Sequence, residues 1–150
     1  DGVGAGREDL DRRAIEARFA TVLYGMLSRD GRLTYCNAGH NPPIVIGDEG
    51  MRRLDKGGLI LGLFEHASFE EETLQLRPGD LIVVFSDGVT EALNPGGDEF
   101  GEERLIECIS QHRREEPHLL LEHILAGVRE FTAEAVQSDD VTALVLRYGG

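Results

Sequence analysis

The sequence predicts an α+β fold in which two helices cover a mostly antiparallel β-sheet. Three observations lead to this prediction. First, short segments that alternate polar and apolar residues fill the first half of the chain. Second, two segments with apolar residues at helical spacing follow. Third, the chain has a last apolar run near its C-terminal end. With 150 residues, of which 41% are hydrophobic, the chain has the size and composition of one globular domain.

The first half of the chain is expected to form strands joined by tight turns. Residues 19–28 are rich in β-branched and aromatic side chains, and residues 32–37 alternate again after an Arg-Asp-Gly turn signal, which is typical of a hairpin. Gly39 and two prolines predict a loop over residues 38–43. Three further short segments, each bounded by turn residues, are predicted strands: 44–47, 51–54 and 70–76.

The second half is expected to contain a buried strand, two helices and a final strand. Residues 81–85 are a continuous apolar run, which predicts a strand buried on both faces. Residues 89–101 follow no period and are expected to form a loop. Residues 102–115 and 117–133 carry apolar stripes at helical spacing, and residues 141–146 are again nearly all apolar and predict the last strand.

Composition and charge exclude several classes of protein. The 15 basic residues against 28 acidic ones give a formal charge of −13, which argues against a nucleic-acid partner, because such a protein presents a basic face. No apolar run reaches about 18 residues, so no membrane span is expected, and the charged residues 1–18 do not resemble a signal peptide. Cys36 and Cys108 form no C-x-x-C pair and fall on apolar patterns, which predicts unreactive core thiols in a cytoplasmic protein.

Three aspartates are candidate metal ligands. Asp87 follows the buried run of residues 81–85, and Asp139 and Asp140 come just before the last predicted strand. If these strands pair antiparallel, the carboxylates meet at one edge of the sheet, where their mutual repulsion favours a divalent cation. Oxygen ligands suit Mg²⁺ or Mn²⁺. The alternative interpretation is structural, because Asp-Gly and Asp-rich turns are common in loops.

Several motifs follow one another in a fixed order along the chain. Their sequences are FATVLYG at 19–25, RLTYCNAGHNPP at 32–43, Gly-Leu at 62–63, LRPGDLIVVFSDGVTEA at 76–92, Glu-Phe-Gly at 99–101 followed by Arg-Leu at 104–105, and QSDDVTALVL at 137–146. In this order they resemble the PPM-type, metal-dependent protein serine/threonine phosphatases (protein phosphatase 2C-like), and most closely the bacterial SpoIIE/RsbU-like branch.

The resemblance implies a fold, a reaction and a set of site residues. The implied fold is a mostly antiparallel, two-sheet β-sandwich flanked by helices. The implied reaction is hydrolysis of phosphoserine or phosphothreonine by water activated at a two-metal Mn²⁺ or Mg²⁺ site, without a phosphoenzyme. Asp87 and Asp139 match the family's metal-binding positions, with Asp140 as the less favoured ligand of the doublet. The implied substrate is a small bacterial signalling protein such as a phosphorylated anti-anti-sigma factor.

One family motif lacks a full counterpart. The family's first metal motif is an Asp-containing, Gly-His-Gly-like turn well before the strand that matches residues 19–25, and residues 1–6 (DGVGAG) are similar to it only superficially. We therefore expect residues 1–18 to be a lead-in and helix remnant and residues 19–150 to be the C-terminal two thirds of such a domain. This expectation keeps open a non-catalytic, partner-binding pseudophosphatase. It also predicts self-association through an incomplete sheet, because uncovered strand edges favour it.

A third interpretation comes from residues 96–100. From Gly96 to Phe100 they spell GGDEF, the signature string of diguanylate cyclases, which would convert GTP to a cyclic dinucleotide. The cyclase motif requires a β-hairpin and an acidic metal segment upstream, and the sequence offers neither in that context. The phosphatase resemblance also places a Gly, acidic and Phe-Gly pattern at this point, and is therefore the interpretation the sequence favours.

The histidines are interpreted one by one. His40 lies in a Gly/Pro loop, where it either lines a substrate groove or bonds local backbone. His112, His118 and His123 fall on or near predicted helices, but no two of them are three or four residues apart. They are therefore expected to be surface residues and not metal ligands.

Overall fold

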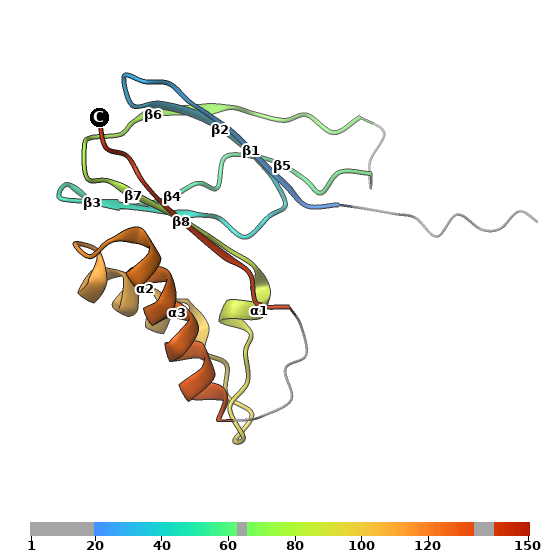
Figure 1. The fold of residues 1–150 in the computed structure, drawn as a ribbon. Helices are drawn as coiled ribbons and strands as arrows, with labels where there is room; N and C mark the ends of the chain where they lie inside the picture. Colours follow the sequence, from blue (N-terminus) through green and yellow to red (C-terminus); the bar gives the residue numbers. More distant parts are fainter. Residues whose placement is uncertain (1–19, 63–65, 134–139) are drawn as a thin grey trace, which may run out of the picture.

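The computed structural model describes residues 20–62, 66–133 and 140–150. Figure 1 shows three layers: a first β-sheet, a second β-sheet stacked on it, and a layer of helices against the outer face of the second sheet. The strands are largely antiparallel, so the predicted α+β sandwich flanked by helices is confirmed. Among the helices described, none is long and apolar enough to cross a membrane.

The first sheet is built around β2 (Arg32–Ala38). β1 (Val22–Leu27) pairs antiparallel along one side of β2 over its whole length. β6 (Glu72–Gln75) and the two-residue β5 (Gly57–Gly58) pair with the other side. β5 is possible only because its residues are glycines, since a Cβ on Gly57 would lie 1.8 Å from the carbonyl oxygen of Asn37.

The second sheet has the strand order β4-β3-β7-β8, with every neighbouring pair antiparallel. Its members are β3 (Ile44–Gly47), β4 (Gly50–Arg53), β7 (Leu81–Phe85) and β8 (Ala143–Arg147). β7 is an inner strand, and four of its five residues are buried. This agrees with the unbroken apolar run in the sequence, because a strand covered on both faces needs apolar side chains on both.

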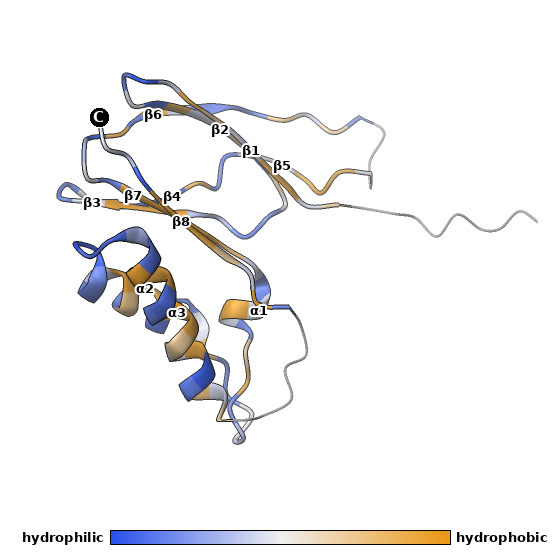
Figure 2. Cartoon of the chain, in the orientation of Figure 1, coloured by the Kyte–Doolittle hydropathy of each residue, from blue (hydrophilic) through white to orange (hydrophobic). Residues whose placement is uncertain are grey.

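Two longer helices and one short helix form the third layer. α2 (Gly101–His112) and α3 (Pro117–Thr132) form a helical hairpin on the second sheet, and α1 (Asp87–Thr90) follows β7 directly. The apolar stripes of α2 and α3 face the sheet (Figure 2). Pro117 suits the start of α3, where a backbone N–H has no helical partner to lose.

Buried apolar residues form two clusters, one on each side of the second sheet. The helix-facing core lies between this sheet and the helices and consists of Ile44, Ile46, Leu81, Val83, Phe85, Val89, Ala92, Phe100, Leu105, Ile109, Leu120, Ile124 and Val128. The sheet-facing core lies between the two sheets and consists of Leu33, Tyr35, Val45, Leu54, Leu74, Leu76 and Ile82. β7 contributes to both cores, so the strand that leads to Asp87 is fixed from two sides.

The structure corrects the predicted elements in two places. Residues 87–90 form α1 where a turn followed by a loop was predicted, because a helix of four residues is too short to show a helical period. β5 lies between the predicted strands 51–54 and 70–76, where no strand was predicted. β3 and β7 have the predicted boundaries. The predicted lead-in and helix remnant at residues 1–18 lie outside the described residues.

Candidate functional site

The ends of two neighbouring strands meet at one edge of the second sheet. β7 and β8 pair antiparallel up to Phe85, which lies opposite Ala143. The end of β7 is therefore beside the start of β8, as the sequence predicted. This pairing brings the segment that continues into Asp87 next to the segment that leads from Asp140 into β8.

Ser86 fastens these two segments to each other. Its backbone N–H donates to the carbonyl of Thr142 at 2.9 Å, and its hydroxyl donates to the carbonyl of Asp140 at 2.9 Å. The N–H of Thr142 donates back to Ser86 Oγ at 3.0 Å. The backbone of Asp140 is thereby tied to the residue directly before Asp87. Sequence reasoning missed this role, although a serine beside a turn is a frequent partner of backbone groups.

Asp87 begins α1, and it is an exposed residue. Its carbonyl accepts hydrogen bonds from the N–H of Glu91 at 2.8 Å and from Thr90 Oγ1 at 3.3 Å, which closes the short helix. Val89, two residues further on, is 0% exposed and belongs to the helix-facing core. The backbone of Asp87 is thus anchored by a buried neighbour, while its carboxylate remains accessible to an ion from solvent.

The acidic residues at this edge fit a hard divalent cation by their donor type. Asp87 and Asp140 are both exposed residues and offer carboxylate oxygens, the ligands that Mg²⁺ and Mn²⁺ prefer. Asp139, the third predicted ligand, lies outside the described residues. The assignment of Asp87, Asp139 and Asp140 as metal ligands therefore stays a prediction.

A pocket of about 280 Å³ borders the same edge. Phe85 and Thr90, which flank Asp87 along the chain, contribute to its wall. The rest of the lining comes from the loop after β2, one residue of β4, the segment between α1 and α2, and the start of α2: Asn41, Pro42, Arg53, Glu91, Glu99, Gly101 and Glu102. The pocket therefore offers a recess for a small group beside the strand end that carries Asp87.

His40 belongs to a loop that is held by its own hydrogen bonds. Asn37 is 4% exposed, and its amide donates to the carbonyls of His40 at 2.9 Å and Leu54 at 3.0 Å. The N–H of His40 donates back to Asn37 Oδ1 at 2.8 Å, and His40 Nδ1 lies 2.8 Å from the carbonyl oxygen of Asn41. Of the two roles that the sequence left open for His40, the structure therefore supports bonding to local backbone.

The GGDEF string occupies a tight turn and one core position. Asn94 and Asp98 close the turn, with a hydrogen bond from the N–H of Asn94 to the carbonyl of Asp98 at 2.9 Å. Gly97 has a φ of +86°, which favours glycine at that point of the turn. Phe100 is 4% exposed and packs edge-on against Phe131 of α3, with 5.5 Å between ring centroids. Packing and turn geometry thus account for these residues.

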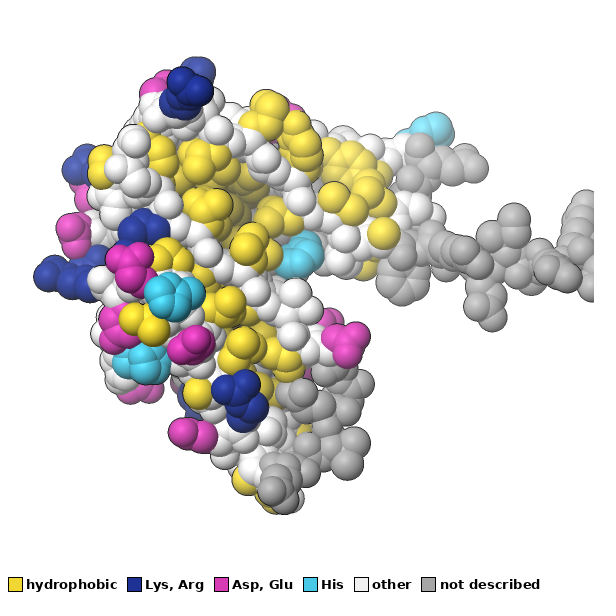
Figure 3. Space-filling view, in the orientation of Figure 1, with side chains coloured by type: hydrophobic (Ala, Val, Ile, Leu, Met, Phe, Trp, Pro, Cys, Tyr) yellow, Lys and Arg dark blue, Asp and Glu magenta, His cyan; other side chains and the backbone are white. Residues whose placement is uncertain are grey.

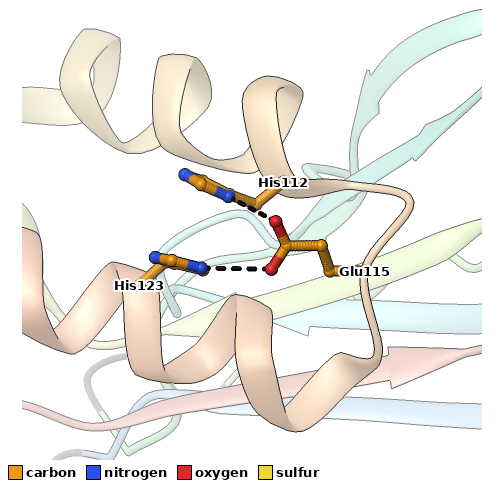
Figure 4. A group of neighbouring side chains, drawn as sticks. All are labelled: His112, Glu115 and His123. Atoms are coloured by element: carbon orange, nitrogen blue, oxygen red, sulfur yellow. Dashed lines mark hydrogen bonds and ion pairs between the residues drawn. The ribbon is translucent and has the colours of Figure 1, made fainter.

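Two of the three helix histidines meet at the connection between α2 and α3. The rings of His112 and His123 stack with centroids 3.7 Å apart, and both face the carboxylate of Glu115 (Figure 4). Each ring forms a hydrogen bond with this carboxylate. These two bonds, chiefly the one from His112, hold the pKa of Glu115 below its ordinary value. His118 and His123 are exposed and His112 is half-buried, in keeping with the predicted surface positions, but the sequence did not predict that His112 and His123 meet. Packing of the two helices brings the pair together, and no local spacing in the sequence indicates it.

A sequence comparison assigns nearly the whole chain to one family. Residues 6–149 match the family described as Stage II sporulation protein E (SpoIIE). The match includes the strand end at Asp87, the aspartate doublet and the GGDEF string in a single alignment.

Two curated proteins are similar to the chain. Protein IcfG of Synechocystis sp. is 31% identical over 134 residues, a match that covers 87% of this chain and 21% of IcfG. Phosphoserine phosphatase RsbU of Bacillus subtilis is 32% identical over 142 residues, a match that covers 86% of this chain and 39% of RsbU. The chain therefore spans well under half the length of these relatives.

Solved structures share the fold. The SiaA-PP2C domain of Pseudomonas aeruginosa superposes with a TM-score of 0.70 at 22% identity, over 79% of this chain and 47% of that domain. The phosphatase domain of SpoIIE from Bacillus subtilis, from a crystal presoaked with manganese, gives a TM-score of 0.65 at 19% identity over 87% of this chain and 57% of that domain.

Proposed function

The chain belongs to the SpoIIE family of PP2C-type phosphatase domains, and from this membership we propose that it hydrolyses phosphoserine or phosphothreonine on a bacterial signalling protein in a metal-dependent reaction. The observation that carries the proposal is the strand-end geometry. An accessible Asp87 follows a strand that is buried on both faces, and Ser86 ties it to the segment of Asp140. The similar Bacillus subtilis protein RsbU is a phosphoserine phosphatase by name.

In this proposal the aspartates at the strand ends hold the metal. Asp87 and Asp139 are the principal ligands, and Asp140 is the third candidate. A bound Mn²⁺ or Mg²⁺ would polarise the phosphoryl group and lower the pKa of water in its coordination shell. The contribution of Ser86 is positional, because its three hydrogen bonds limit the movement of one strand end relative to the other. The pocket lined by Phe85 and Thr90 would receive part of the substrate.

The substrate class follows from the family and from the shape of this edge. A phosphorylated side chain of a protein can reach an exposed carboxylate, whereas a deep pocket would be needed to enclose a small metabolite. We propose a cytoplasmic signalling protein with one phosphorylated serine or threonine, such as an anti-anti-sigma factor. We also propose that the exposed apolar residues of β1 and β8 support self-association.

The direct test is Mn²⁺-dependent hydrolysis of an aryl phosphate by the chain and by its Asp87→Asn variant. Loss of one charged ligand removes several kcal/mol of transition-state stabilisation, so turnover should fall about 100-fold or more. Asp30→Asn is the matched control, because Asp30 is also an exposed aspartate but lies in the β1–β2 turn, next to Arg29, whose carbonyl accepts a hydrogen bond from Tyr148 beyond the far end of β8. Turnover that is equal in Asp87→Asn and in the unchanged chain would contradict the proposed ligand.

The same measurements separate the other interpretations. A non-catalytic, partner-binding domain predicts no Mn²⁺-dependent turnover in either protein. The cyclase interpretation predicts consumption of GTP with Mg²⁺, and an Asp98→Asn substitution within the GGDEF string would abolish it. A phosphatase predicts turnover of the aryl phosphate and none of GTP.

A further inference from the structure

The connection between α2 and α3 brings three side chains with metal-binding atoms into contact, well away from the strand-end aspartates. His112 is the last residue of α2, Glu115 lies in the connection, and His123 lies in the second turn of α3. His112 Nδ1 lies 2.9 Å from Glu115 Oε1, and His123 Nε2 lies 3.1 Å from Glu115 Oε2 (Figure 4). The ligand atoms of the three residues all lie within 4.8 Å of one another.

We propose that His112, Glu115 and His123 form a binding site for a divalent transition-metal ion, with Zn²⁺ as the best-suited ion. Tetrahedral coordination with bonds of about 2.0–2.2 Å places ligand atoms about 3.3–3.6 Å apart. The nitrogen–oxygen distances of 2.9 and 3.1 Å are only slightly shorter. The three ligand atoms are thus already close together, and rotation of these partly exposed side chains would admit an ion between them.

The two imidazoles have to turn from their present stacking to share an ion. Their planes differ by 13°, and the facing nitrogen of each ring points toward the same carboxylate. Because an imidazole nitrogen binds a metal ion in the plane of its ring, the two rings tilt toward each other when one ion contacts both nitrogens and the carboxylate.

The donor set selects the class of metal. Two imidazole nitrogens and one carboxylate suit Zn²⁺, Ni²⁺, Co²⁺ or Cu²⁺, whereas Mg²⁺ prefers oxygen ligands only. The side chains of His112, Glu115 and His123 are 26%, 40% and 44% exposed, so solvent reaches the site and a water molecule can complete a fourth position.

The surrounding structure holds the ligands in place before any ion binds. The Arg147 guanidinium of β8 donates to the carbonyl of Arg113 at 2.9 Å and also to the carbonyl of Glu115, which ties the connection to the sheet. On α2, Ile109 lies one turn before His112 and is 0% exposed. On α3, Ile124 is next to His123 and is also 0% exposed. A preorganised frame of this kind reduces the conformational entropy that binding removes.

The proposed site is separate from the strand-end aspartates. Arg147, which contacts the α2–α3 connection, pairs with Leu81 at the start of β7, whereas Asp87 lies beyond the end of the same strand. Four residue steps of a strand cover about 13 Å. Figure 1 shows the α2–α3 connection and α1 at opposite ends of the second sheet. Binding at the histidines is therefore expected to be independent of Asp87.

The test is calorimetric titration of the chain with Zn²⁺, repeated with Mg²⁺. We expect one Zn²⁺ ion per chain at the histidines and no comparable binding of Mg²⁺ there. His112→Ala and His123→Ala should each weaken this binding about 100-fold or more, since loss of even an outer partner of a metal ligand costs about 10–100-fold. Visible absorption of Co²⁺ added to the chain gives a second measurement, which should show a tetrahedral spectrum that both variants lose.

Matched controls identify the site. His118 is an exposed histidine of α3, the helix that also carries His123, but it lies outside the cluster. His118→Ala should therefore leave Zn²⁺ binding unchanged. Cys108→Ser should also leave it unchanged, because the Cys108 thiol is not one of the three ligand groups that come together. Circular dichroism of each variant verifies folding, and Glu115→Gln provides a third variant of similar shape. Absence of Zn²⁺ binding, or equal binding in the chain and in both folded histidine variants, would overturn the proposal.

Discussion

The two sides of the second sheet differ in how completely they are covered. On the helix side, thirteen buried residues form the helix-facing core, and α2 and α3 extend over the sheet. On the other side, seven residues form the sheet-facing core, and large apolar side chains remain exposed along the edge strands. Leu144 of β8 is 57% exposed on this side, and Tyr24 and Met26 of β1 are each 54% exposed on the outer face of the first sheet. Figure 3 views the two sheets from the edge and shows hydrophobic side chains gathered over them on the side of the molecule in view.

The packing that holds the strand-end site in place is therefore different from the packing at the exposed edge strands. Asp87 follows a strand that is anchored in the larger core, so its position depends mainly on the packing of the helices. The exposed residues of β1 and β8 contribute little to that packing, because their neighbours in the described structure leave them open to solvent. Substitutions should therefore lower the free energy of unfolding much more in the helix-facing core than at the exposed residues of β1 and β8.

The largest effect is expected for Leu120→Ala in α3. Leu120 is 0% exposed in the helix-facing core, and truncating a buried leucine leaves a cavity that costs about 2–5 kcal/mol of unfolding free energy. The neighbouring Leu119 is 37% exposed on the same helix, so Leu119→Ala should cost much less and serves as the matched control. Urea denaturation of the two variants measures the difference. Equal losses would mean that the helix layer is not packed as described.

An intermediate effect is expected for Tyr35→Phe in the sheet-facing core. Tyr35 is 1% exposed, and its hydroxyl donates to Glu72 Oε2 at 2.5 Å. Loss of this hydrogen bond to a carboxylate should cost about 1–2 kcal/mol at neutral pH. The hydroxyl also accepts a long hydrogen bond from the N–H of Lys56 at 3.3 Å, and because the substitution keeps the ring, a much larger loss would contradict the description of these two bonds as the hydroxyl's contribution.

The same variant gives a prediction for alkaline pH. Burial, together with the bond to Glu72, raises the pKa of Tyr35 from 10.0 to about 12. Between these values the unfolded chain loses the Tyr35 proton before the folded chain does, so the free energy of unfolding falls as pH rises. Tyr35→Phe lacks this ionisation, and the stability difference between the two proteins should therefore narrow from pH 9 to pH 11. A constant difference would contradict the raised pKa.

Much of the fold and of the strand-end site could be predicted because their signals are local. The apolar run at residues 81–85 predicted a strand buried on both faces, and its pairing with the last strand predicted that Asp87 and Asp140 approach each other. α1 was missed because four residues show no period. The contact between His112 and His123 was missed because it arises from the packing of two helices against a common sheet, which residue spacing does not encode.

The smallest effect on stability is expected for Met26→Thr in β1. Met26 lies opposite Thr34 on the outer face of the first sheet, and threonine is well suited to a strand, so the unfolding free energy should change by less than about 0.5 kcal/mol. Leu33→Thr is the matched control, because Leu33 is 6% exposed in the sheet-facing core and its substitution should cost several times more. If copies of the chain associate through the exposed strand, sedimentation velocity should also show a smaller associated fraction for Met26→Thr. A loss of more than about 1 kcal/mol in the monomer would show instead that Met26 is covered in solution, and the comparison between the two sides of the sheet would then fail at this strand.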